Sequence, residues 1–219
     1  MPVAIQPVNP SEPEIQKKAF RGLVWLGIVS ITMLFGGLTS AYIVRQGEGK
    51  WVEFDLPQLF KISSFIIILS SLTMQWGLIS LRKSNLRNLK IAMILTVILG
   101  AGFVFSQYYA WSELYNNGIV FTGRISDIKS EFKYIPSGKE TIAEAADVGN
   151  VAGSFLYVLT GLHVAHLLVG VIALIVVFSR ALAGKYSAAN HNGVKMCAIY
   201  WHFLGGLWLY LFLFLLYIR

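Results

Sequence analysis

Five long stretches of the chain contain no charged residue. They cover residues 22–44, 62–81, 91–112, 148–179 and 196–218. A helix needs about 20 predominantly apolar residues to cross the hydrocarbon core of a bilayer, and each stretch is long enough. The fourth exceeds one crossing, so its helix is expected over about 153–178, with its first residues in the preceding loop. The pattern predicts an all-α, polytopic membrane protein with five transmembrane helices.

The charges between these stretches predict the orientation. If the N-terminus is cytoplasmic, that side holds ten of the 18 Lys and Arg residues but only two of the 11 acidic residues, Glu12 and Glu14. Cytoplasmic loops carry an excess of Lys and Arg. We therefore expect residues 1–19 to be a cytoplasmic N-terminal segment, residues 20–219 to be the transmembrane domain, and the C-terminus to lie outside. Residues 113–150 then form one long outer loop, and loops of that length are uncommon unless they are functional or disordered.

Composition agrees with a membrane protein. Charged residues make up 13% of the chain, against about 25% in ordinary soluble proteins. The net charge is +7, but the basic residues flank the apolar stretches as topology requires, so no nucleic-acid partner is expected. The single cysteine, Cys197, excludes an intrachain disulfide and a cysteine-rich metal site.

Small and polar residues inside the stretches predict how the helices pack. Ser and Thr hydroxyls are expected to bond their own helix backbone, and Gln75 and Gln107 are expected near helix ends, where water or headgroups reach. Small residues at four-residue spacing let helix backbones approach closely. The pairs are Gly36 with Ser40, Gly37 with Ala41, and Gly102 with Ser106.

The histidines are the sharpest chemical feature. His163 and His166 share one helix face, and His202 follows Trp201 in the last stretch. They could ligate haem, or they could be neutral groups hydrogen-bonded in the bundle. At 1.5 Å per residue, His166 lies about 20 Å and His202 about 9 Å from the inner ends of their helices. Two axial haem ligands need similar depth, so the spacing favours hydrogen bonding to the bundle or to lipid headgroups.

The apolar stretches contain no Asp, Glu, Lys or Arg. Transporters and proton carriers place such groups inside the membrane, so a small transporter or channel is disfavoured. The chain also lacks a nucleophile–base pair, a zinc-ligand spacing and a phosphate-binding loop. We expect no catalytic residue and no metal site, and therefore a non-catalytic membrane subunit that packs on a larger partner, binds lipid, or does both.

Several motifs resemble one known family. Residues 160–166, TGLHVAH, resemble the GLHxxH signature of cytochrome c oxidase subunit III, and residues 200–208, which begin YWHF and end in Trp, resemble its closing helix. Gln107 with Glu113 resembles a Gln…Glu pair that ends an earlier helix, and residues 40–42, SAY, resemble the end of the first shared helix. The matches keep their order along residues 20–219.

The resemblance implies the five-helix bacterial form of an accessory subunit of a haem–copper terminal oxidase, in the bacterial cytoplasmic membrane. Such a subunit carries no haem or copper, which lie in partner subunits. It packs on subunit I in a complex with subunit II, binds phospholipid in a cleft between helices, and stabilises turnover and proton uptake. Its electron donor, cytochrome c or quinol, is decided in the partner subunits. The candidate structural and lipid-binding residues are His163, His166, His202, Trp201, Gln107 and Glu113.

The chain departs from the family pattern in its ionisable groups. The family's buried Ser-Glu pair is Ser30-Ile31 here, Lys195 stands where an acid is common, and Gly205 replaces an Asp. These losses favour scaffolding and lipid binding over a direct proton role. Residues 122–147 form an insertion in the outer loop, and we expect it to contact an extra periplasmic cytochrome or a second respiratory complex.

Two alternatives remain open at this stage. The histidines would suit a haem-binding membrane electron carrier, and the motifs would suit a subunit III-like protein of a nitric oxide reductase system. A haem absorption band in the isolated chain would support the first alternative. The proteins that co-purify with the chain would identify the second.

Overall fold

The computed structural model describes residues 12–48, 51, 54–117, 119, 121, 151–184, 186 and 191–218. Within these residues it confirms five helices long and apolar enough to cross a membrane. They are α1 (Glu12–Gln46), α2 (Leu59–Arg82), α3 (Leu86–Asn116), α5 (Val151–Leu182) and α6 (Asn192–Tyr217). The insertion at 122–147 lies outside the described residues, and its partner stays a prediction.

Most helix ends lie beyond the charge-free stretches, because a helix can continue into the interface after its apolar residues end. α3 extends through Glu113, so the connection between α3 and α5 begins after Asn116 rather than at residue 113. Between α2 and α3 the chain turns through Ser84, which has a positive φ of 58°. Asn85 then caps α3, because its side-chain oxygen accepts a hydrogen bond from the Asn88 N–H at 3.1 Å.

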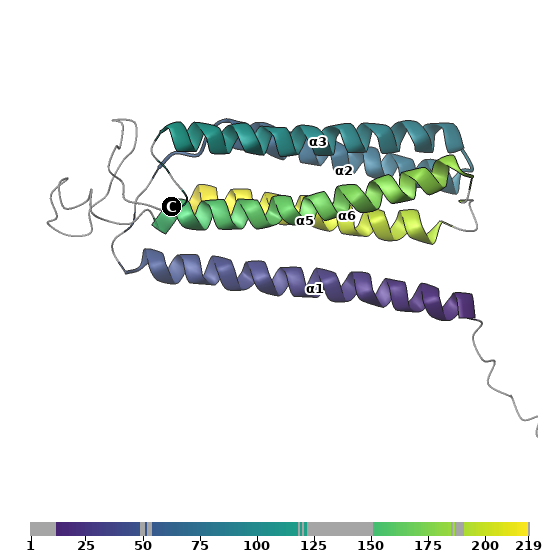
Figure 1. Cartoon of the computed structure of the whole chain (residues 1–219), viewed down its shortest axis with the longest axis horizontal. Helices are drawn as coiled ribbons and strands as arrows, with labels where there is room; N and C mark the ends of the chain where they lie inside the picture. The colour runs from purple at the N-terminus through teal and green to yellow at the C-terminus, as the bar shows by residue number, and fades with distance from the viewer. Residues whose placement is uncertain are drawn as a thin grey trace, which may run out of the picture.

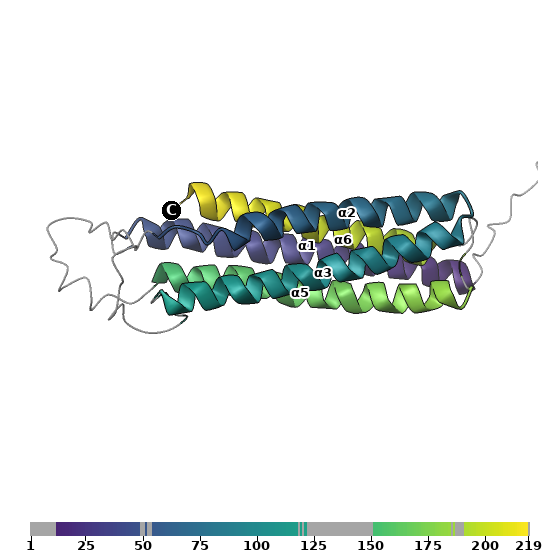
Figure 2. The same ribbon diagram turned by 90° about the horizontal axis from the view of Figure 1, so that it is seen from above.

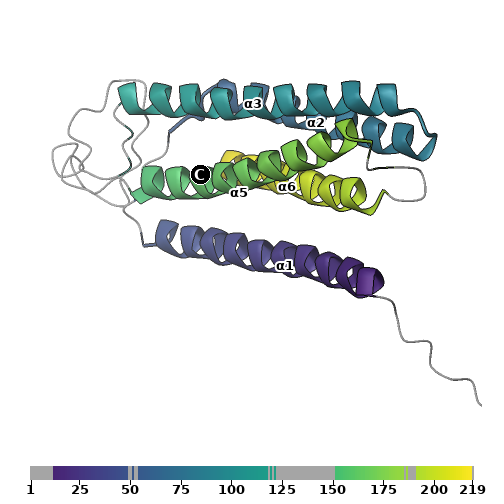
Figure 3. The same ribbon diagram turned by 45° about the vertical axis from the view of Figure 1, so that its right-hand side comes forward.

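The helices form three layers. α2 and α3 make one layer, α5 and α6 the middle layer, and α1 lies alone on the other side of the middle layer (Figures 1 and 3). Seen from above, all of them run close to one common direction (Figure 2). The start of α1, the α2–α3 turn, the end of α5 and the start of α6 lie at one end of the bundle. The described chain therefore begins and ends at opposite ends of the bundle.

Glycines inside the bundle allow close helix contact, but not those expected from the sequence. A Cβ on Gly100 would lie 2.9 Å from the Trp201 ring, and one on Gly77 would lie 3.2 Å from the Ala92 Cβ. In contrast, Gly36, Gly37 and Gly102 have no other group within 4 Å of such a Cβ among the described residues. These three glycines therefore do not mediate close contacts within the described chain, because spacing along a helix does not reveal which face meets a neighbour.

α1 contacts the rest of the bundle mainly through its C-terminal half. The Tyr42 ring lies 5.1 Å from Phe214 of α6 and 5.7 Å from Phe155 of α5, in edge-to-face geometry. The Tyr210 hydroxyl of α6 lies 3.1 Å from the Thr39 hydroxyl. Towards the N-terminal end, Leu23 and other large apolar side chains are exposed. α1 is therefore anchored at one end and separates from α5 and α6 towards the other.

Candidate functional site

Trp201 lies at the point where four helices meet. Its side chain is buried, and its Nε1–H donates to the Ser70 hydroxyl of α2 at 3.0 Å. On the other sides its ring fills the space beside Gly100 of α3 and Gly170 of α5. A tryptophan in lipid needs both a partner for its N–H and room for its large ring. The two glycines and the serine supply these requirements, which gives Trp201 a structural role.

Trp208 repeats this arrangement two turns along α6. Its Nε1–H donates to the Ser64 hydroxyl of α2 at 3.0 Å, and Ser64 donates to its own helix at the Phe60 carbonyl, 2.8 Å away. The ring stacks on Phe60 and meets Phe103 of α3 edge-on at 4.9 Å. The expected return of Ser hydroxyls to their own backbone is thus confirmed at Ser64. The same hydroxyl also joins two helices, which the sequence did not indicate.

His163 lies in the same core and has no hydrogen-bond partner among the described residues. The imidazole is fully buried, with its centroid 5.8 Å from Phe103 and 5.2 Å from Trp208. Neither ring nitrogen is paired in the described part of the chain. This differs from the expected hydrogen bonding within the bundle. The side chain also lies away from the lipid-facing surface, so it does not meet a headgroup.

The other two histidines are hydrogen-bonded at different interfaces. The His166 Nδ1 lies 2.7 Å from the Leu162 carbonyl, and its ring meets Phe35 of α1 at 6.0 Å. The His202 Nε2 lies 3.3 Å from the Gln75 Oε1 of α2. His163 instead faces α3 and α6. The three imidazoles thus occupy three separate interfaces, and this arrangement does not favour a bis-histidine haem.

Gln107 is buried in the bundle and not accessible at a helix end. Its side chain is fully buried, and its Nε2 donates to the Ser63 hydroxyl of α2 at 2.8 Å. The predicted position near water or headgroups is wrong, because α3 continues about 14 Å further to Asn116. Glu113 lies about 9 Å beyond Gln107 along α3, where its side chain is exposed. The structure therefore does not bring Glu113 together with Gln107 and the histidines.

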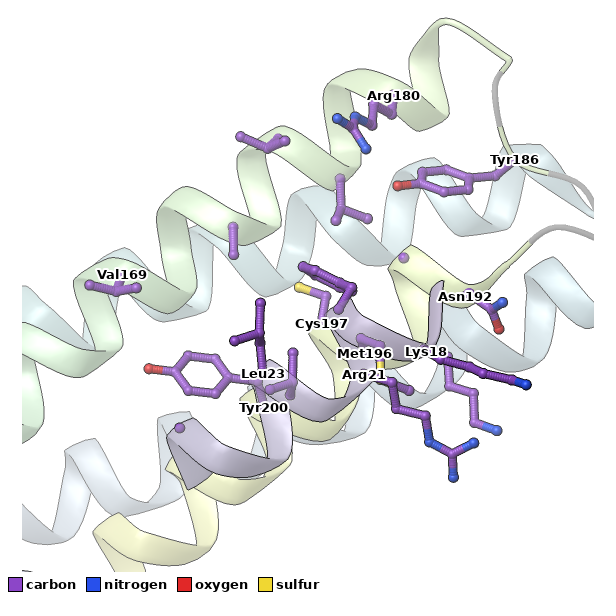
Figure 4. A pocket seen from close by; sticks show the side chains of 18 of the residues that line it. Lys18, Arg21, Leu23, Val169, Arg180, Tyr186, Asn192, Met196, Cys197 and Tyr200 are labelled. Carbon is purple, nitrogen blue, oxygen red and sulfur yellow. The ribbon is translucent and has the colours of Figure 1, made fainter. Parts of the chain in front are cut away.

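A groove of about 1220 Å³ opens between α1 and the pair α5 and α6. It lies where the N-terminal half of α1 separates from the bundle, and its walls are mainly apolar (Figure 4). Leu23, Val169 and Tyr200 line its deeper part, while Lys18 and Arg180 lie towards the end of the bundle. A long apolar groove with charged side chains at one end is suited to an amphipathic ligand.

The positive charges at the groove come from three helices. The basic residues that line it are Lys18, Arg21, Arg180 and Lys195. None of the three candidate histidines lines the groove. In the sequence these four basic residues are visible only as charges that flank apolar stretches. Nothing in the sequence places the end of α5 beside the start of α1. Among the described residues, no three His, Cys, Asp or Glu side chains gather closely enough to hold a metal ion.

A family model and individual known proteins match this chain, and their descriptions agree with one another. A family model described as cytochrome c oxidase subunit III matches residues 138–219. The chain is 30% identical over 193 residues to cytochrome c oxidase subunit 3 of Thermostichus vulcanus, covering 84% of this chain and 80% of that protein. It is 27% identical over 195 residues to the same subunit of Corynebacterium diphtheriae, covering 85% and 82%.

A longer relative shows the same likeness. The chain is 31% identical over 187 residues to the probable cytochrome c oxidase subunit 3 of Rickettsia bellii, covering 82% of this chain but 56% of that protein. The identity thus extends along most of this chain, beyond the local histidine motifs. Together with the five membrane-spanning helices, these likenesses show that the chain belongs to the cytochrome c oxidase subunit III family, the accessory subunits of haem–copper oxidases.

Proposed function

We propose that this chain is the non-catalytic subunit III of a terminal oxidase in a bacterial cytoplasmic membrane. It packs on subunit I in a complex with subunit II, leaves haem and copper to those partners, and holds phospholipid that stabilises turnover and proton uptake. Family membership supports association with other oxidase subunits. The groove beside α1 is the observation that carries the lipid part of the proposal.

The groove has dimensions suited to a phospholipid of one leaflet. From Lys18 to Ile31, both of which line it, α1 rises about 20 Å. Half of a hydrocarbon core about 30 Å thick is about 15 Å, which leaves room for a headgroup. The apolar walls suit acyl chains. The four cations suit an anionic headgroup, because each basic residue near an anionic lipid surface contributes about 1 kcal/mol.

The charge distribution supports an orientation with this end in the cytoplasm. The described Lys and Arg side chains at the groove end of the bundle have no described carboxylate beside them. They are Lys18, Arg21, Arg82, Lys83, Arg87, Lys90, Arg180 and Lys195. The opposite end mixes signs, with Arg45 paired to Glu48. By the positive-inside rule, the phospholipid then occupies the cytoplasmic leaflet and the C-terminus lies outside.

The lipid proposal is tested by measuring the phospholipid bound to the purified oxidase complex. We expect Arg180→Gln to weaken retention of anionic phospholipid about fivefold, the factor that corresponds to about 1 kcal/mol. Lys83→Gln is the matched control, because Lys83 is exposed at the same end and does not line the groove. Equal phospholipid content in wild type and Arg180→Gln would contradict the proposal.

The accessory role has a separate test. The oxidase is purified in mild detergent from cells with and without this chain, and its visible spectrum and oxygen consumption are followed during turnover. We expect the same haem bands per complex in both preparations, with faster loss of activity when the chain is absent. A loss of haem from the complex without this chain would contradict the non-catalytic assignment.

A further inference from the structure

Two buried polar side chains on facing helices have hydrogen-bonding atoms that no described residue satisfies. Gln107 of α3 leaves its Oε1 unpaired, and His163 of α5 leaves both ring nitrogens unpaired. Both side chains are fully buried. A bilayer interior offers no solvent to such atoms, so each one carries a large desolvation cost unless it finds a partner.

The two groups lie at neighbouring levels of the buried core. α3 and α5 are antiparallel, and Phe103 of α3 meets His163. About two turns of α3 beyond Phe103, the Trp111 Nε1 donates to the Thr160 hydroxyl of α5 at 3.0 Å. Gln107 lies on α3 between these two contacts, about 6 Å in rise from Phe103. The unpaired atoms therefore belong to two buried side chains at neighbouring levels of the core.

The surrounding hydroxyls have no hydrogen left to donate to Gln107. Ser63 donates to the Phe60 carbonyl at 3.0 Å, which makes it the acceptor for the Gln107 Nε2 and fixes the orientation of the amide. Thr160 donates to the Leu156 carbonyl at 2.7 Å, and Ser64 donates to the Phe60 carbonyl. Among the described side chains, only His163 is then left as a donor for Oε1, and the alternative is a bound molecule such as water.

The structure shows no direct bond between the two side chains. A neutral imidazole has one N–H donor and one acceptor nitrogen, and neither is paired with the Gln107 Oε1. A water molecule has two donors and two acceptor sites. After the water has donated to Oε1 and bonded one imidazole nitrogen, it still has a donor or acceptor site for a further partner. Buried waters occupy polar sites of this kind.

We propose that an internal water molecule binds between Gln107 and His163, in the core enclosed by α2, α3, α5 and α6. It donates to the Gln107 Oε1 and bonds a ring nitrogen of His163. The site is separate from the phospholipid groove, since neither side chain lines it. The proposal stands on the buried contacts and does not depend on the proposed function.

Cryo-electron microscopy of the intact complex, at a resolution that shows ordered water, tests the site. We expect a density peak within about 3.2 Å of both the Gln107 Oε1 and a His163 ring nitrogen. Gln107→Leu and His163→Phe should each remove the peak. Ser106→Ala should retain it, because the buried Ser106 hydroxyl bonds its own helix at the Phe103 carbonyl. A wild-type map without the peak, or with a direct Gln107–His163 bond, would overturn the proposal.

Retention of the chain in the heated complex gives a second measurement. Each single variant leaves the remaining polar group without its full set of partners, so the temperature of dissociation should fall in both. The double variant Gln107→Leu, His163→Phe removes both polar groups. Its dissociation temperature should fall by less than the sum of the decreases in the two single variants. Strictly additive losses would show that the two side chains share no site, and would count against the bridging water.

Discussion

At the scale of single residues, α6 is joined to α2 by two tryptophan–serine hydrogen bonds. Trp201 donates to Ser70 and Trp208 to Ser64, both at 3.0 Å. Hydrophobic side chains gain nothing by leaving lipid for the protein interior, so helix association relies on close packing and on hydrogen bonds between helices. Both are present at Trp201, where Gly100 allows the ring to approach α3.

A first prediction concerns the space beside Trp201. Gly100→Ala places a Cβ 2.9 Å from the buried indole and should cost about 1–3 kcal/mol of unfolding free energy through overpacking. Unfolding of the purified complex by SDS in mixed micelles measures the loss. Gly102→Ala is the control, because its Cβ would meet no described group within 4 Å. Equal effects of the two substitutions would refute this account of Gly100.

A second prediction concerns the Trp201–Ser70 hydrogen bond. In a double-mutant cycle of Trp201→Phe and Ser70→Ala, we expect a coupling energy of about 0.6 kcal/mol, with about 1.7 kcal/mol as the upper bound for hydrogen bonds between membrane helices. Unfolding in SDS of the wild type, the two single variants and the double variant supplies the free energies. Full additivity would show that the bond contributes nothing to the stability of the folded chain.

At the scale of elements, α1 differs from the other four helices. Its C-terminal half is anchored by Tyr42 and by the Tyr210–Thr39 hydrogen bond, whereas its N-terminal half forms one wall of the groove. A helix anchored along only part of its length leaves an opening on its free side. The packing of Tyr42 therefore contributes to the attachment of α1, the helix that forms one wall of the groove.

A third prediction tests this anchor. Tyr42→Ala removes ring contacts with Trp51, Phe155 and Phe214 and should lower the stability of the chain by about 3 kcal/mol, as other buried aromatic truncations do. Bound phospholipid should fall in parallel, because the groove loses one wall. Trp25→Ala on the same helix should change stability little, since Trp25 is 48% exposed. Thermal dissociation and lipid analysis of the complex measure both effects.

At the scale of the whole molecule, charge differs between the two ends of the bundle. The groove end is uniformly basic among the described side chains, and the other end also carries the carboxylates of Glu48, Asp55 and Glu113. By the positive-inside rule, this asymmetry supports the proposed orientation, with the groove end in the cytoplasm. It also places the cations of the groove where an anionic phospholipid of the cytoplasmic leaflet would have its headgroup.

A fourth prediction fixes the orientation experimentally. Lys61 and Lys83 are exposed at opposite ends of α2 and form a matched pair for substitution by cysteine, in a background where Cys197 is replaced by Ala. A membrane-impermeant maleimide applied to spheroplasts should label Lys61→Cys and not Lys83→Cys. Inverted vesicles should give the reverse pattern. Labelling of Lys83→Cys in spheroplasts would require the opposite topology.

The relation between sequence and candidate site varies from residue to residue. Trp201 and the three histidines are identifiable in the sequence as a motif, yet their partners come from helices far away along the chain. Ser70, for example, lies on α2, and Phe103 on α3. The groove cations Arg21 and Arg180 are visible only as charges at the ends of apolar stretches. Their contribution to one site arises from the packing of α1 against α5 and α6.

The five transmembrane helices can be predicted from the sequence alone, because a helix in lipid satisfies its backbone hydrogen bonds within its own segment. Length and absence of charge are therefore sufficient to find such a helix. The face that each helix buries follows instead from the packing of the folded chain. This packing placed Gln107 in the core instead of at a helix end, left Gly36 and Gly37 outside the close contacts, and opened the groove beside α1. These outcomes depend on how side chains of different helices fit together, and the apolar pattern of a single helix carries little of that information when lipid and protein interior are equally apolar.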